Sequence, residues 1–160
     1  DRFNDCKSSS TQCRCPKKDG EDQAIGRSKG GLSTKIHATV DALGNPTSFH
    51  LTPGQAHDLC GADELIPTLE ANILLADKAY DAAERVIDVL QNAGKKSVIP
   101  SKSSRLEPRE YDRELYKSRH LIENFFCKLK QFRAIATRYD KTARNFLAAI
   151  YLTSAIIWLN

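Results

Sequence analysis

The chain has 160 residues, of which 41% are hydrophobic and 28% are charged, an ordinary composition for a globular domain. Its formal net charge of +4 is too mild to identify a polyanionic partner by itself. The longest apolar run, 146–159, is interrupted by Thr153 and Ser154 and is too short to span a bilayer. The composition therefore argues against a membrane-spanning protein, and the run predicts a buried helix with Trp158 in the core.

The first 20 residues are polar, rich in Ser and Lys, and without alternation, which predicts a poorly ordered tail before one domain over 21–160. They lack the apolar segment of a signal peptide. The chain contains no methionine, which indicates a processed product or a C-terminal fragment. Five cysteines without paired spacing predict free thiols in a reducing cytoplasm, and no second ligand pair accompanies Cys13 and Cys15.

Two segments of alternating polarity, 35–40 and 47–52, predict the strands of an antiparallel hairpin, because the residues between them supply turn chemistry. His37 and His50 lie in these strands, where packing or hydrogen bonding is the expected role. The glycine-rich basic segment 26–31 lacks the P-loop pattern, so we expect a flexible loop there.

A short helix over 58–71, weakened by Pro67, is expected to precede a strand. The compact apolar run 72–76 predicts a strand that is buried on both faces. Asp77 follows at the strand end, the place where open α/β sheets bind ligands. Two readings of Asp77 stay open, a residue that caps the loop and a metal-binding or catalytic carboxylate.

Asp81 and Glu84 resemble a capping box that begins a helix running to about Asn92, with Gly94 as the residue that stops it. A short strand at 97–100 and a polar loop at 101–110 are expected to follow.

Two further helices are predicted, one over 112–132 and one that Thr142 caps and that runs to Trp158. The order of strands and helices along the chain is typical of an α/β domain with a mixed sheet flanked by helices.

The helix over 112–132 groups polar side chains on one side. Tyr116, Arg119, Glu123 and Lys130 fall within an arc of roughly 60° at helical spacing, opposite an apolar stripe. An ordinary solvated ion pair could explain Glu123 alone. However, Asp77 and Glu123 can converge at one sheet edge, and paired carboxylates there suit Mg²⁺ and phosphoryl transfer on nucleic acid.

The segment 133–144 is basic and includes Arg133, Arg138 and Lys141 beside one aromatic residue. Such a segment suits a surface that follows a nucleic-acid backbone, so these three residues are candidates for DNA binding. The alternative is a solvated loop between two helices.

Taken together, Tyr116, Arg119, Glu123 and Lys130 reproduce a Tyr-x2-Arg-x3-Glu-x6-Lys signature, and with it the chain resembles bacterial insertion-sequence DDE transposases. Other segments resemble the same family and occur in the same order: 22–37, 51–58, 76–81 and 138–146.

The resemblance implies an RNase H-like fold in which three carboxylates bind two Mg²⁺ or Mn²⁺ ions. Water and then a DNA 3′-OH would attack a phosphodiester at the transposon end. Asp77 matches the family's second acid and Glu123 its third, while Tyr116, Arg119 and Lys130 match positions that support the site and contact transposon-end DNA. The implied partners are double-stranded DNA, as transposon ends and target, and a second copy in a homodimer. The implied location is the bacterial cytoplasm, on the nucleoid.

The family's first acid ends the first strand of the sheet, but the corresponding region here has no apolar strand, which implies a missing or degenerate first strand. Asp5 is the candidate for this acid by its distance along the chain. Without that acid the metal pair should bind weakly, and we expect little or no strand transfer. Two alternatives stay open: an inactive remnant that at most binds DNA, and an RNase H-like nuclease without strand transfer.

Overall fold

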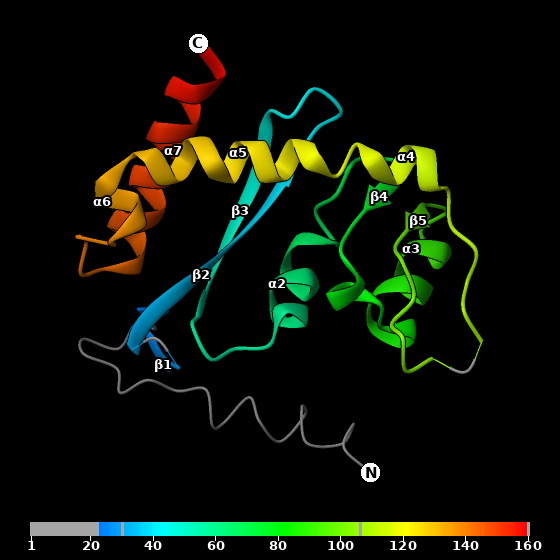
Figure 1. Cartoon of the computed structure of the whole chain (residues 1–160). Helices are drawn as coiled ribbons and strands as arrows, with labels where there is room; N and C mark the ends of the chain where they lie inside the picture. The colour runs from blue at the N-terminus through cyan, green and yellow to red at the C-terminus, as the bar shows by residue number, and fades with distance from the viewer. Residues whose placement is uncertain (1–22, 30, 106, 160) are drawn as a thin grey trace.

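The computed structural model of the chain describes residues 23–29, 31–105 and 107–159. Figure 1 shows a long β-hairpin on one side of the molecule and a short strand pair with its helices on the other. A nearly straight bar of two helices runs over both parts. The predicted tail over residues 1–20 lies outside the described residues, and the domain over 21–160 stays a prediction.

The hairpin consists of β2 (Gly31–Val40) and β3 (Pro46–Pro53), which pair antiparallel as predicted. At the turn, the Asp41 carboxylate accepts hydrogen bonds from the backbone N–H groups of Leu43 and Asn45. The expected flexible loop at 26–31 is wrong in part, since β1 (Gly26–Ser28) pairs antiparallel with the first residues of β2.

A second, separate sheet consists of β4 (Ile73–Leu75) and β5 (Lys96–Val98), which pair in parallel. The α/β class is confirmed, but the prediction of one mixed sheet is wrong for the described residues, which form a three-stranded and a two-stranded sheet. The two sheets stay separate because no described strand joins one sheet to the other through backbone hydrogen bonds. Ile73 is 39% exposed, so burial on both faces was also a wrong prediction for β4.

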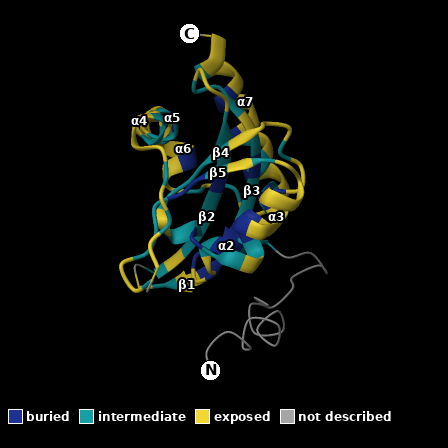
Figure 2. Cartoon of the chain, turned by 90° about the vertical axis from the view of Figure 1, so that its right-hand side faces the viewer, coloured by how far each residue is buried: buried dark blue, intermediate teal, exposed yellow. Residues whose placement is uncertain are grey.

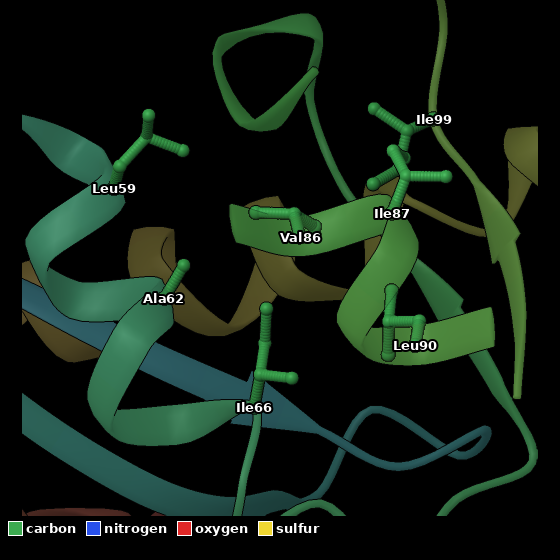
Figure 3. Close-up of a cluster of buried hydrophobic side chains, with 7 residues drawn as sticks. All are labelled: Leu59, Ala62, Ile66, Val86, Ile87, Leu90 and Ile99. Carbon is green, nitrogen blue, oxygen red and sulfur yellow. The ribbon is translucent and has the colours of Figure 1, made fainter. Parts of the chain in front are cut away.

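Of the helices beside the strand pair, the first is shorter than predicted, while the next helical segment reaches its predicted end at Asn92. α2 (Asp58–Leu65) ends before Pro67 instead of reaching residue 71, because proline lacks an N–H and its ring collides with the preceding turn. A 3₁₀-helix, η2 (Lys78–Tyr80), follows β4, and a π-helix, η3 (Ala83–Ile87), leads into α3 (Asp88–Asn92). Figure 3 shows how α2 faces η3 and α3 across a core of these buried side chains: Leu59, Ala62, Ile66, Val86, Ile87, Leu90 and Ile99.

The predicted capping box is wrong. Ala82 precedes η3 without a capping side chain, and Asp81 instead binds Arg105 and the backbone N–H of Lys102. Arg105 binds both oxygens of the carboxylate, and such a two-point bond to a guanidinium favours this arrangement over a single backbone N–H cap.

The predicted long helix is divided into α4 (Arg113–Lys117) and α5 (His120–Gln131). At the junction, backbone bonds span three residues, such as Arg119 N–H to the Tyr116 carbonyl, so the chain tightens without a large change in direction. α6 (Arg133–Ala136) and α7 (Ala143–Leu159) follow. They pack with α5 and β3 around a second core: Phe49, Phe125, Leu129, Ile135, Phe146 and Ile150.

Thr142 caps α7 as predicted, because its hydroxyl accepts the Asn145 N–H. However, α7 is not a buried helix. It buries Phe146, Ile150, Thr153 and Ser154 but exposes other large apolar side chains, among them Trp158 at 65%, so the placement of Trp158 in the core was wrong. Figure 2 shows this exposed end of α7. No helix in the described part of the chain is long and apolar enough to cross a membrane.

Candidate functional site

Asp77 lies where β4 ends and η2 begins. One carboxylate oxygen, Oδ1, accepts the Lys78 backbone N–H at 2.5 Å, so the residue does cap the loop. The other, Oδ2, faces Arg119 at 4.0 Å, and the side chain is 48% exposed. Capping therefore occupies one oxygen and leaves the second available for another cation.

Arg119 joins Asp77 to Glu123. Its Nη1 lies 4.0 Å from Asp77 Oδ2, and its Nη2 donates to Glu123 Oε1 at 2.5 Å. The 3₁₀-like junction between α4 and α5 places the arginine opposite the end of β4, while Glu123 is one turn further along α5. Two carboxylates 46 residues apart in sequence thus lie near one guanidinium.

Tyr116 completes this cluster from α4. The Arg119 guanidinium carbon lies 5.7 Å from the centre of its ring, a cation–π contact, and Tyr111 packs edge-on at 5.5 Å. Burial raises the pKa of the Tyr116 phenol. The positive charge of Arg119 lowers this pKa and the negative charge of Asp77 raises it further, and the net change is an increase. The phenol is consequently a protonated donor at neutral pH, positioned beside the cation that the two acids share.

The remaining sequence-predicted DNA-binding residues lie along α5 and beyond it. Lys130 is seven residues after Glu123, about 10 Å along the helix, so it is not part of the acid cluster. It lines a groove of about 610 Å³ between β2 and the helices α5 to α7. Arg133 and Lys141 are exposed.

The Arg138 side chain is engaged by contacts within the protein. Its guanidinium donates to the carbonyls of Gln23 at 2.6 Å and Ala24 at 2.9 Å, binds the Thr34 hydroxyl, and lies over the Phe146 ring at 5.0 Å. Burial lowers the pKa of Arg138, with a smaller opposite effect from Asp140. These contacts fasten the start of the hairpin to α7 rather than present a free cation.

Sequence reasoning missed a carboxylate clamp next to the acid cluster. Asp81 is 2% exposed, and it accepts two hydrogen bonds from Arg105, at 2.8 and 3.0 Å, and one from the Lys102 N–H at 2.9 Å. Arg109 lies 3.7 Å away. These three partners follow Asp81 by 21 to 28 residues along the chain, so no local sequence pattern could have indicated them.

A second cluster that the sequence did not indicate surrounds His37 beneath α2. Its Nε2 is 2.8 Å from the Thr52 hydroxyl, and its Nδ1 is 3.5 Å from the Tyr80 hydroxyl. Burial lowers the pKa of His37 and outweighs the opposite effect of Asp58. Any side chain at Gly61 would begin 2.3 Å from the imidazole, so glycine lets α2 approach β2. The expected hydrogen-bonding role of His37 is confirmed.

The donors at Asp77 and Glu123 suit a hard divalent cation, since both are half-exposed carboxylates that already share one positive charge. Within residues 23–29, 31–105 and 107–159, no group of three or more His, Cys, Asp or Glu side chains is arranged to hold a metal ion. The sequence-predicted first acid, Asp5, lies outside the described residues, as do Cys13 and Cys15.

A model of the family described as "Transposase DDE domain" matches residues 9–158. The chain is 39% identical over 129 residues to a protein from Brucella ovis that is named as a transposase for insertion sequence element IS6501. The match spans 80% of this chain and 99% of that relative. No solved structure matches the chain significantly.

Proposed function

The chain belongs to the DDE transposase family, and from that premise we propose that it acts in DNA transposition by metal-dependent phosphodiester cleavage and strand transfer at insertion-sequence ends. The family implies phosphoryl transfer on DNA and the RNase H-like fold. The single observation that supports the finer proposal is the meeting of Asp77 and Glu123 at one guanidinium.

In this proposal Asp77 and Glu123 hold Mg²⁺ or Mn²⁺, two ions in all, with Asp5 as the third acid. When bound, such ions supply Lewis-acid stabilisation of the attacking and leaving oxygens of a phosphodiester. The support from this chain is the donor set, because exposed carboxylate oxygens can bind a hard cation without removing a buried partner.

Arg119 has two roles in the proposal. Without DNA it offsets the repulsion between Asp77 and Glu123, as its contacts to both acids indicate. With DNA, its planar fork can donate to two oxygens of a phosphate. Tyr116 positions the guanidinium through the ring contact and keeps a phenolic proton to donate. Lys130, Arg133 and Lys141 extend the proposed DNA-binding surface, whereas Arg138 is assigned to structure.

The test is Mg²⁺-dependent cleavage and joining of duplexes taken from the DNA that flanks the gene. Glu123→Gln and Asp77→Asn should each reduce turnover by at least a thousandfold, because each removes a charged metal ligand. Glu114→Gln is the matched control, since Glu114 is an exposed acid on the same helical bar that pairs only locally with Lys117 in an i, i+3 contact.

Asp5→Asn tests the third acid in the same assay and should abolish turnover. The second candidate function is an inactive relative that binds DNA, which would be the outcome if no third acid joins Asp77 and Glu123. A wild-type chain that binds these duplexes but shows neither cleavage nor joining supports that candidate. Cleavage without joining supports a nuclease.

We also propose that two copies associate through α7. Its apolar face consists of side chains that are 43–83% exposed: Tyr151, Leu152, Ile156, Trp158 and Leu159. Residues 145–159 include no charged residue, so two such faces can meet without like-charge repulsion. Residues 1–22 contain one large apolar side chain, Phe3, which makes them a poor cover for this surface. Exposed apolar patches of this kind mark interaction sites.

Light scattering of the purified chain tests this association. The wild type should be a dimer at micromolar concentration, and Leu152→Glu should be a monomer, because the change buries an unpaired charge in the interface. Leu43→Glu is the control, since Leu43 is similarly exposed but lies in the hairpin turn. A monomeric wild-type chain would contradict the proposal and leave the face for another partner.

A further inference from the structure

A hollow of about 350 Å³ opens beside Asp77, between the start of η2 and the polar loop that follows β5. The residues that line it are Asp77, Lys78, Ala79, Lys102, Ser103 and Ser104. Four of these six carry an ammonium or hydroxyl group, the groups that bind phosphate oxygens as point charges or hydrogen-bond donors. The hollow therefore combines an acid of the proposed site with anion-binding chemistry.

The two walls of the hollow are held together by the Asp81 clamp. Asp81 is four residues after Asp77 on the η2 side, and it accepts the Lys102 backbone N–H at 2.9 Å and the Arg105 guanidinium at 2.8 Å. Arg105 N–H in turn donates to the Lys102 carbonyl at 3.0 Å, which closes the loop into a turn. Asp81 is buried, and its hydrogen bonds connect this turn to the segment that carries Asp77.

The two ammonium groups have no carboxylate partner among the residues that the structure describes. Asp77, the acid nearest to them in the hollow, instead contacts its own neighbouring N–H and Arg119. Asp81 is occupied by Arg105 and Arg109. Lys78 and Lys102 thus add positive charge in the hollow beside Asp77, in addition to the charge of Arg119 near Asp77 Oδ2.

We infer that this hollow binds a phosphate of the DNA backbone that flanks the phosphodiester held at Asp77 and Glu123. The inference rests on the proposed function and adds Lys78, Lys102 and the Ser103–Ser104 hydroxyls as a subsite that positions the strand. The lysines of the hollow and Arg119 would hold neighbouring phosphates of one strand, so that the reacting phosphate stays at the carboxylates. Backbone contacts of this kind fix register without reading sequence.

The test is the salt dependence of binding to a fluorescein-labelled duplex of mixed sequence, measured by anisotropy. Lys78→Gln and Lys102→Gln should each make the slope of log K against log salt less steep by about 0.9, the value for one lost phosphate contact. Lys102→Arg should restore the slope. Lys96→Gln is the matched control, since Lys96 is exposed and begins β5, at the strand end opposite to the Asp77 end.

The possible results distinguish a failure of the proposed phosphate subsite from a failure of the proposed function. Slopes for Lys78→Gln and Lys102→Gln that equal the slope for Lys96→Gln, with wild-type binding intact, would overturn the subsite and leave the proposed function standing. A wild-type chain whose binding to duplex DNA is undetectable would overturn both. A reduced slope for the two subsite variants alone, with unchanged circular dichroism, supports the inference.

Discussion

Asp77 and Asp81 lie four residues apart, yet the fold treats their carboxylates in opposite ways. Asp81 is 2% exposed and receives hydrogen bonds from a guanidinium and a backbone N–H. Asp77 is 48% exposed and shares one more distant guanidinium with Glu123. A carboxylate whose oxygens are bound by the protein's own donors stabilises the fold, whereas one with an unbound oxygen is available for metal or substrate.

The largest expected effect is on stability at Asp81. Asp81→Ala should lower the free energy of unfolding by about 3 kcal/mol, because it leaves two arginines facing a vacated buried site. Asp77→Ala should change it by less than about 1 kcal/mol, since exposed ion pairs contribute little. Urea denaturation at pH 7 measures both. Equal losses of stability at the two positions would mean that Asp77 and Asp81 contribute equally to the fold.

The stability that Asp81 contributes should depend on pH. Burial by itself raises the pKa of Asp81, but the hydrogen bonds from Arg105 and Lys102 and the arginine charges outweigh it and lower the pKa below 3.8. A lowered folded pKa contributes stability above the unfolded value that is lost as pH falls through the folded one. The stability gap between wild type and Asp81→Asn should therefore be constant above about pH 5 and shrink below pH 3.8. A gap that grows on acidification would contradict this.

A smaller effect should distinguish the two arginines of the clamp. Arg105→Met should cost about 1.5 kcal/mol, because two short charge-assisted hydrogen bonds to Asp81 are lost. Arg109→Met should cost about 0.5 kcal/mol, since its guanidinium is 3.7 Å from the same carboxylate. Chemical denaturation of the two variants side by side gives the difference. The reverse order would mean that Arg109 is the main partner.

The smallest effect on stability is expected at Glu123. Glu123→Gln should change the free energy of unfolding by less than about 0.5 kcal/mol, because it removes one exposed i, i+4 ion pair on α5. The same variant should lose metal-dependent turnover, which calorimetry or denaturation does not measure. A stability loss above about 1.5 kcal/mol would place Glu123 with Asp81, as a structural carboxylate.

Much of the fold could be predicted where the signal is local. The alternation in 35–40 and 47–52 gave the hairpin, and the Thr142 cap gave the start of α7. Pairing at i, i+4 on one helix also brought Arg119 to Glu123. Predictions failed where a distant partner decides. Asp81 looked like a helix cap because local spacing cannot represent a guanidinium 24 residues away.

The sequence by itself determined the residue types of the site and their placement on α4, α5 and the end of β4, because helical period and strand length are properties of short segments. The exposure of Asp77 and the burial of Asp81 follow from the tertiary structure alone. The tertiary structure also decided that the strands form two sheets and that α7 turns Phe146 and Ile150 into the core but leaves Trp158 and Leu159 exposed. These outcomes depend on burial and on long-range hydrogen bonds, which arise only when the two parts of the chain meet.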